Sequence, residues 1–242
     1  ISLIVGFNLV MGIGGADMPT VIATLNSFTG ISAAALGFVL NNKVLIVAGA
    51  LDGSSGLILA IIMSQAMNRS FANILFGSVG KILEQEQSVQ EGRVIQQYTV
   101  EDVATVLDGA KSIIIVPGYG MGVAQAQFVV KELADLLQKY GADVKFAIHP
   151  VAGRMPGHMN VLLAEANVSY DQLWEMERIN PLFPQADVAI VVGANDVTNP
   201  AARNRADSPL YGMPILDVDK AKTIVFIKRS TRPGFAGVDN DL

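Results

Sequence analysis

The residues with the clearest chemical potential form a glycine-rich turn near the middle of the chain. An apolar run at residues 112–117 leads directly into Gly118-Tyr119-Gly120-Met121-Gly122-Val123. Glycines permit a tight turn in which the backbone approaches a ligand closely, and the N-terminus of a following helix attracts phosphate. The spacing Gly118-x-Gly120-x-x-Val123 therefore predicts a dinucleotide-binding turn, although the same spacing fits many such domains.

A basic cluster, Lys228-Arg229-Ser230, follows the last apolar run. Two cations and a hydroxyl can bind one anion, which is the chemistry that a 2′-phosphate requires. A domain that binds NAD would instead carry Asp or Glu about 20 residues past the glycines, to hold the ribose 2′-hydroxyl. The run at residues 143–148 is followed by His149-Pro150 without such an acid. Both features favour NADP over NAD, although the Lys-Arg pair alone also fits a solvated strand edge.

Other polar loop residues have two interpretations each. Arg154 could contact a pyrophosphate or lie on the surface. Asp196 could contact a ribose or nicotinamide, or form an Asx-turn with Asn195. His149 and His158 could serve acid-base chemistry or bind a metal, but two histidines in a Pro/Gly loop more often shape it. No catalytic triad or metal-ligand set is apparent. The candidate cofactor contacts are Gly118, Tyr119, Gly120, Met121, Val123, Ala152, Gly153, Arg154, Gly193, Asn195, Asp196, Lys228, Arg229, Ser230, Gly234, Phe235 and Ala236.

The elements that must position these residues alternate between strand and helix. A helix is expected to begin at Thr99, with acids in its first turn, and to end near Leu107. Trp174 and the methionines are predicted to lie in the core. The alternation predicts an α/β Rossmann-like domain, a doubly wound parallel sheet whose ligands bind outside the carboxyl ends of the strands. Strands are predicted at residues 112–116, 143–148, 187–192 and 223–228, and helices at 123–140, 159–166 and 171–179.

An α-helical membrane segment is predicted to precede this domain. Up to Met67 the charged residues are Asp17, Lys43 and Asp52. The apolar stretches at 21–40 and 44–67 are each long enough to cross the hydrocarbon layer as a helix. Residues 1–13 are expected to be the end of another span. Asp17 is predicted as the N-cap of the first full span, with Pro19 in its first turn.

Polar residues inside these spans are candidates for an ion path. An ionisable group in mid-membrane is costly, so Asp52 by default marks an ion or proton route, the alternative being a residue that faces a water pocket. Asn26 could pair with another helix or line a hydrated path. For Ser54 and Ser55, packing between helices is the favoured interpretation.

Composition excludes several classes of protein. The net charge of −5 and the lack of a basic stripe argue against nucleic-acid binding. A chain without cysteine has no disulfides and no thiolate metal sites. Ile1 stands in apolar sequence without a charged n-region, so a signal peptide is excluded and the chain is expected to be a fragment. The predicted organisation is membrane helices at 1–69, a flexible Glu/Gln-rich linker at 70–97 and a soluble domain at 98–242.

Several motifs in order make the chain resemble the proton-translocating NAD(P) transhydrogenases, in the beta-subunit region that holds the last membrane helices and the NADP(H)-binding domain III. The resemblance covers essentially the whole chain and is highly specific. Its motifs are residues 14–19 (GGADMP), 25–27 (LNS), 53–56 (GSSG), 67–70 (MNRS), 118–121 (GYGM), 149–160, 193–196 (GAND) and 228–230 (KRS).

The resemblance implies that this chain binds NADP(H), while a separate domain I, on an alpha subunit or its equivalent, binds NAD(H) and docks onto it. Hydride then passes directly between the two nicotinamides, coupled to proton movement across the membrane, and no side chain acts as acid or base. The remaining membrane helices and a second copy of the complete enzyme are further implied partners. The implied location is a membrane, the bacterial inner membrane being favoured over the mitochondrial one, with the soluble domain on the cytoplasmic or matrix side.

The resemblance also implies roles for individual residues. Lys228, Arg229 and Ser230 match the 2′-phosphate site, and Arg154 matches a pyrophosphate contact. Residues 234–238 match a loop that closes over the nucleotide. The remaining matches are Asn195 and Asp196 near the nicotinamide and its ribose, Asn26 in the proton path, and residues 54–56 and Arg69 in the last helix and at its junction with the soluble domain.

Some features depart from the family pattern. An apolar residue is expected at Asp52, and alanine is more usual at Gly122. Earlier membrane helices and a last strand-and-helix segment are expected beyond the two ends, so domain III is expected to be incomplete and the chain alone is not expected to pump protons. The alternative function is a dinucleotide-sensing domain that gates a channel or transporter without redox chemistry.

Overall fold

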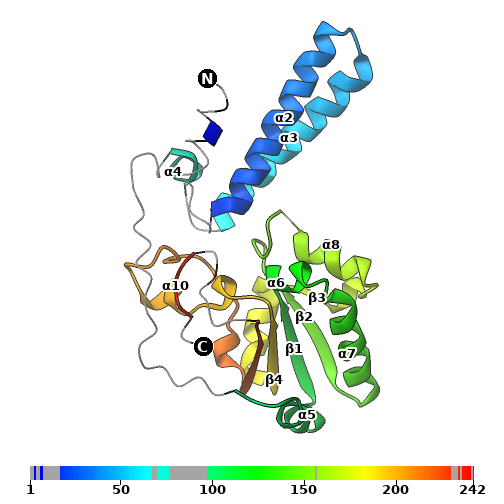
Figure 1. The fold of residues 1–242 in the computed structure, drawn as a ribbon, viewed down its shortest axis with the longest axis vertical. Helices are drawn as coiled ribbons and strands as arrows, with labels where there is room; N and C mark the ends of the chain where they lie inside the picture. The colour runs from blue at the N-terminus through cyan, green and yellow to red at the C-terminus, as the bar shows by residue number, and fades with distance from the viewer. Residues whose placement is uncertain are drawn as a thin grey trace. The chain divides into compact units, whose positions relative to one another are not determined.

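The computed structural model of the chain describes residues 3, 6, 7, 17–66, 70–76, 97–155, 157–229, 234, 236–240 and 242. Contacts divide the chain into two compact units. The first comprises Ile1–Leu83 with the short segments Gly153–Pro156 and Gly212–Pro214. The second comprises Glu84–Ala152, Gly157–Tyr211 and Ile215–Leu242. The first unit contains a pair of long helices and the second contains a sheet (Figure 1).

The two long helices are α2 (Met18–Val39) and α3 (Lys43–Ala66), which form an antiparallel hairpin (Figure 1). Both are long and apolar enough to cross a membrane, as the two apolar stretches predicted. Asp17 takes the N-cap position of α2, with Pro19 in the first turn, but its side chain makes no capping hydrogen bond. A short helix, α4 (Phe71–Phe76), follows in the same unit.

Small residues hold α2 and α3 in close contact. A Cβ atom placed on Gly49 would lie 2.5 Å from the Ala34 nitrogen, and one placed on Gly56 would lie 3.1 Å from the Cβ of Ser27. Ser27 Oγ donates a hydrogen bond of 2.5 Å to the carbonyl of Gly53. Because Gly49, Gly53 and Gly56 share one face of α3, the two backbones approach as they do in close-packed membrane helix pairs.

The second unit contains a five-stranded parallel sheet in the order β3-β2-β1-β4-β5. The two central strands, β1 and β4, are buried along nearly their whole length, as expected for strands covered on both faces. β1 lies between β2 and β4, so the chain reverses its direction of travel across the sheet there. The five strands are β1 (Ser112–Pro117), β2 (Asp143–Ile148), β3 (Leu173–Glu175), β4 (Val188–Val192) and β5 (Thr223–Ile227).

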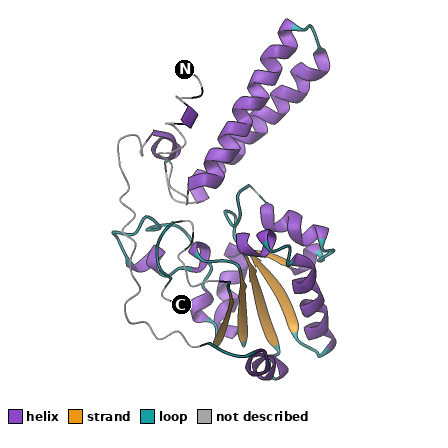
Figure 2. Ribbon diagram, viewed as in Figure 1, coloured by secondary structure: helices purple, strands orange, loops and turns teal. Residues whose placement is uncertain are grey.

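Helices lie on both sides of this sheet (Figure 2), which confirms the predicted Rossmann-like doubly wound fold. Thr99 caps α5 as predicted, because its hydroxyl accepts from Asp102 N at 3.3 Å and Thr99 N donates to Asp102 Oδ2 at 3.0 Å. The helices are α5 (Val100–Asp108), α6 (Tyr119–Val123), α7 (Gln127–Lys139), α8 (His158–Glu165), α9 (Met176–Ile179) and α10 (Ala201–Asn204).

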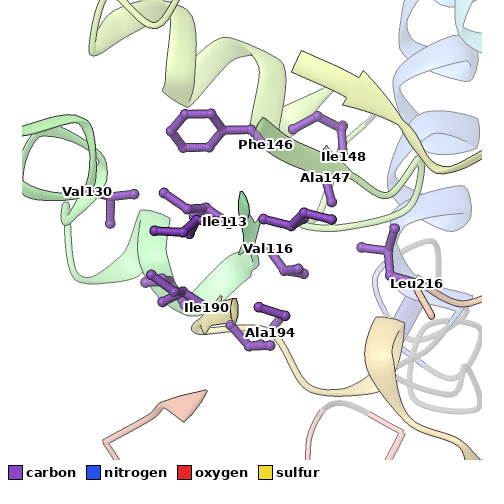
Figure 3. Packing of buried hydrophobic residues seen from close by; sticks show 14 of the residues in the cluster. Ile113, Val116, Val130, Phe146, Ala147, Ile148, Ile190, Ala194 and Leu216 are labelled. Atoms are coloured by element: carbon purple, nitrogen blue, oxygen red, sulfur yellow. The ribbon is translucent and has the colours of Figure 1, made fainter. Parts of the chain in front are cut away.

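The core of the second unit lies between the central strands and the helices (Figure 3). Val130 of α7 contributes to it, together with Ile113, Phe146 and Ile190 of the sheet. The prediction that the methionines are buried holds for most of those that the structure describes, since Met63, Met121, Met159 and Met213 are buried, Met18 and Met176 are half-buried and Met155 is exposed. Burying each apolar side chain of this size stabilises the folded state by about 1.5–3 kcal/mol. The cluster therefore holds the ends of the strands in a fixed arrangement.

The single helix predicted at residues 123–140 is in fact broken into α6 and α7. Gln125 stands between them in the left-handed region, with φ 52. The turn is a Schellman motif, in which Ala126 N donates to Met121 O and Gln125 N donates to Gly122 O, both at 3.0 Å. Glycine or asparagine usually occupies the left-handed position of such a motif. Because glutamine occupies it here, the sequence carried no signal for the break.

The helix predicted at residues 171–179 is also wrong over most of its length. Leu173–Glu175 forms β3 and pairs with residues 146–148 of β2, leaving only the short α9. The ring of Trp174 lies 5.5 Å from Lys145 Nζ and 4.7 Å from Arg178 Cζ, so cations flank it at the sheet edge. Trp174 packs against the core but is only partly buried. Pairing with β2 has overridden the local helical preference.

Candidate functional site

The carboxyl ends of β1, β4 and β5 bring three of the predicted loops together. Gly118 N donates to Val192 O at 2.9 Å, and Gly193 N donates to Ile227 O at 3.1 Å, so the strand pairing continues into the loops. The reversal of strand order places the switch point of the sheet between β1 and β4. Doubly wound folds bind nucleotides outside the carboxyl edge at such a point.

The glycines of these loops are required by contact between the loops themselves. A Cβ atom on Gly118 would lie 2.5 Å from the Ala194 nitrogen, and one on Gly120 would lie 2.9 Å from the Cα of Gly193. Gly193 has φ 64, and Gly120 N donates to its carbonyl at 2.9 Å. The close backbone approach expected of a glycine turn is therefore observed between two loops of the protein. Contact between these glycines and a cofactor stays a prediction.

The other residues of the first loop have different surroundings. Met121 is buried in the core, whereas Val123 is 50% exposed. The ring of Tyr119 lies 6.0 Å from the ring of His158, which begins α8. The helix that starts in this loop, α6, has only five residues. Its dipole is therefore much weaker than that of the long helix predicted to point at a phosphate.

Lys228 lies exposed at the end of β5 and reaches the loop that follows β4. Its Nζ donates a hydrogen bond of 2.7 Å to Asn195 Oδ1, and Asn195 Nδ2 donates at 3.1 Å to Asp196 Oδ1. Although much of the side chain is exposed, partial desolvation of its ammonium group lowers the pKa of Lys228, while the charges of Asp196 and Asp239 oppose that shift. Arg229 is exposed beside Lys228, so the strand end presents two cations. Ser230, the third member of the predicted cluster, lies outside the described residues.

A segment near the end of the chain lies against the same loop. Ala236 N donates to Asp196 Oδ2 at 3.0 Å, and Asn240 Nδ2 donates to the Asn195 carbonyl at 3.1 Å. A Cβ atom on Gly234 would lie 2.7 Å from Asn195 Nδ2. The Asx-turn considered for Asn195 and Asp196 does not form, since both side chains bond to other partners. Phe235 lies outside the described residues.

Asn199 and Asn240 were not among the predicted site residues. Asn199 is fully buried, donates from Nδ2 to the Asp239 carbonyl at 3.0 Å and accepts from Ala201 N. Together with Asn240, it holds residues 236–240 on the loop after β4. Asparagines in a loop are common turn residues, so only the folded arrangement distinguishes these two.

A buried histidine occupies the position after β2, where an NAD-binding domain would carry an acid. His149 is 2% exposed, and its Nδ1 accepts from Val151 N at 3.2 Å, so it shapes the loop.

Glu175 ends β3 and pairs in register with Ile148. The sequence predicts a helix over this segment, so it gives no indication that Glu175 stands at the end of a strand. Within the described parts of the chain, no group of three His, Cys, Asp or Glu side chains could hold a metal ion.

The loop after β2 contains three further candidates. Ala152 is buried in the core of the second unit. Gly153 has φ 103, a conformation that favours glycine. Contacts group residues 153–156, including Arg154, with the first unit. The predicted contacts of these residues with a cofactor therefore remain predictions.

In the helical hairpin, the structure brings Asn26 and Asp52 to the same side. Asn26 and Gly30 are one turn apart on one face of α2, and a Cβ atom on Gly30 would lie 2.9 Å from Asp52 Oδ2. Both polar residues are exposed on the hairpin. Ser54 Oγ donates to the Ala50 carbonyl at 2.7 Å, and the adjacent Ser55 is exposed. Arg69 lies outside the described residues.

Comparison with known proteins gives a consistent result. A family model described as NAD(P) transhydrogenase beta subunit matches residues 1–242. The chain is 56% identical over 245 residues to a protein of Rhodospirillum rubrum named NAD(P) transhydrogenase subunit beta, covering 100% of this chain and 53% of that relative. A relative of the same name from a strain of that species gives the same values. The chain thus spans about half the length of these curated relatives.

Proposed function

Because the chain belongs to the NAD(P) transhydrogenase beta subunit family, we propose that it binds NADP(H) and takes part in hydride transfer between NAD(H) and NADP(H), coupled to proton movement across a membrane. The observation that carries the cofactor assignment is the pair Lys228 and Arg229, exposed at the carboxyl end of β5. This pair suits a 2′-phosphate, and the residue after β2 is a buried histidine instead of an acid.

Different residues of the strand-end loops bind different parts of the cofactor. Lys228, Arg229 and Ser230 hold the 2′-phosphate. The loop backbones at residues 118–120 and 193–196 flank the dinucleotide, with Asp196 near a ribose and Arg154 at the pyrophosphate. Residues 234–238 close over it. The nicotinamide supplies the redox chemistry when bound, and the protein supplies position and charge.

The apolar hairpin associates the chain with a membrane. Asn26 and Asp52, on one side of that hairpin, line the proton route together with Ser54 and Ser55, while Arg69 lies at the junction with the soluble domain. A partner subunit carries the NAD(H)-binding domain, and further membrane helices complete the path in a dimeric enzyme. The membrane is the bacterial inner membrane, with the soluble domain on the cytoplasmic side. The domain limits are residues 1–69, 70–97 and 98–242.

The test is single-turnover hydride transfer in the complete complex. After the NAD(H)-binding partner is added, NADPH is mixed with an acetylpyridine analogue of NAD, and the reduced analogue is followed by absorbance. We expect one reduced analogue for each bound NADPH. Stoichiometric NADPH binding without any reduced analogue would contradict the enzyme and support a sensor domain that gates a channel or transporter.

A further inference from the structure

A short segment near the end of the chain, residues 236–240, is docked onto the loop after β4 by two asparagine side chains. Asn199 Nδ2 donates to the Asp239 carbonyl at 3.0 Å, and Asn240 Nδ2 donates to the Asn195 carbonyl at 3.1 Å. The first bond runs from the loop to the segment, and the second runs from the segment back to the loop. The two side-chain amides therefore fasten the segment from both sides.

Asn199 is held in one orientation. Its side chain is fully buried, and its Oδ1 accepts from Ala201 N at 3.0 Å, at the start of α10. A carboxamide accepts at one end and donates at the other, so the bond from Ala201 turns the donating end toward the segment. Because a buried donor without an acceptor is costly, this amide holds the Asp239 carbonyl in place.

Asn240 makes the corresponding contact from the side of the segment. Its Oδ1 accepts from Leu242 N at 3.1 Å, which fixes the orientation of this amide as well. The Asn195 carbonyl that it binds also accepts from Thr198 Oγ1 at 2.9 Å, so the bond ends on an ordered turn. Asn240 is only partly buried, so its truncation leaves the core intact.

The docked segment begins beside residues of the switch point. Ala236 N donates to Asp196 Oδ2 at 3.0 Å. Asp196 belongs to the loop after β4, at the edge where a doubly wound sheet binds its nucleotide. In the proposed function, residues 234–238 close over that nucleotide. A bound nucleotide then leaves only after these residues lift from the loop.

We propose that Asn199 and Asn240 are positioning residues that set the rate at which NADP(H) is released. They hold residues 236–240 against the loop after β4 and so oppose the opening that release requires. Neither asparagine contacts the cofactor, and both act through the docked segment. The inference rests on the proposed binding of NADP(H). Opening of such segments often limits the release of a product, and affinity is mostly tuned through dissociation.

The release rate is measured on the full chain in detergent, by stopped-flow displacement of bound NADPH with excess NADP⁺. For Asn240→Ala, we expect release to be about tenfold faster, equivalent to about 1.4 kcal/mol, because one of the two anchors is lost. The association rate should stay within about twofold, since the loops that meet the ligand keep their own contacts. Asn204→Ala, at the exposed end of α10, is the matched control and should change neither rate.

Hydrogen exchange without cofactor tests the anchors separately. In Asn240→Ala, the backbone amides of residues 236–240 should exchange faster than in the wild type, while those of β1 and β4 keep their rates. Asn199→Ala removes the other anchor and should act in the same direction on exchange and on release. Because Asn199 is buried, its truncation also lowers the melting temperature, so Asn240→Ala is the deciding variant.

The proposal is overturned if Asn240→Ala releases NADPH at the wild-type rate, or if the amides of residues 236–240 keep their wild-type exchange. A purely structural role would lower the number of binding sites and the melting temperature but leave the release rate unchanged, which also overturns the proposal. A wild-type chain that binds no NADPH would refute the proposed function as well. The exchange measurement would then still show whether the two asparagines dock the segment.

Discussion

At the scale of single residues, Gly118 has no room for a side chain in the strand-end loops. A Cβ atom there would lie 2.5 Å from the Ala194 nitrogen, a backbone atom of a loop held by its own hydrogen bonds. Gly118→Ala should therefore force the loops after β1 and β4 apart. We expect the free energy of unfolding, measured by urea titration, to fall by about 1–3 kcal/mol, together with a loss of NADPH affinity.

The matched control is Gly109→Ala. A Cβ atom on Gly109 would meet nothing within 4 Å, and the residue has ordinary right-handed backbone angles. This variant should leave both stability and NADPH affinity almost unchanged. Equal stability for Gly118→Ala and Gly109→Ala would contradict the close contact between the loops.

Residue types and spacing identified the loops after β1, β4 and β5 that the structure brings together, but not the contacts among them, and the binding role of these loops stays a prediction. Lys228 and the loop at residues 193–196 could be selected because charged and polar residues follow apolar runs. The sequence explains Gly118 only as part of a turn that approaches a ligand. In the structure its nearest neighbour is the loop after β4, which is distant in sequence. The roles of Asn195 and Asn240 depend on side-chain directions, which a sequence pattern does not contain.

At the scale of elements, Asp187 ties together three strand beginnings. Its Oδ2 accepts from Lys111 N at 2.9 Å and from Ser112 N at 3.0 Å, and Lys222 Nζ donates to its Oδ1 at 2.8 Å. These residues stand at or just before β1, β4 and β5. The hydrogen bond from Lys222, followed by those from the two backbone nitrogens, lowers the pKa of Asp187 to about 2.

This pKa predicts how stability depends on pH. A carboxyl group whose pKa is lowered on folding stabilises the fold above its ordinary pKa of 3.8, and the contribution is lost as pH falls toward about 2. Asp187→Asn should lower the urea midpoint at neutral pH. The gap between variant and wild type should shrink between pH 4 and pH 2. A gap that stays constant over that range would show that the charge of Asp187 contributes nothing.

The strands that sequence reasoning identified correctly share one property. β1, β2, β4 and β5 are mainly apolar runs bounded by polar or glycine-rich turns, so their positions can be predicted from composition. The break at Gln125 and the strand at Leu173–Glu175 have no such signal. The first depends on a left-handed residue that is not glycine, and the second depends on pairing with β2.

At the scale of the whole molecule, disulfide cross-linking can test the register between α2 and α3. The chain has no cysteine of its own, so only the introduced pair can form a disulfide. A Cβ atom on Gly56 would lie 3.1 Å from the Cβ of Ser27, close enough for a disulfide after a small adjustment. Ser27→Cys with Gly56→Cys should form an intramolecular disulfide on mild oxidation. Trypsin cleavage after Lys43 then leaves the two halves joined until a reductant is added.

The control pair is Ser27→Cys with Ile58→Cys, because Ile58 is 57% exposed and points away from α2 by helical periodicity. This pair should give separated peptides after cleavage with or without reductant. Cross-linking of equal efficiency in both pairs would contradict the register of the hairpin.

The preference of the full chain for NADPH over NADH tests the central claim most directly, and titration calorimetry in detergent measures it. We predict that NADPH binds at least about tenfold more tightly, a difference of about 1.4 kcal/mol. Lys228→Ala combined with Arg229→Ala should remove that preference, at a cost of about 1.5–3 kcal/mol for each charged hydrogen bond lost. Equal affinities in the wild type, or an unchanged NADPH affinity in the double variant, would contradict the account.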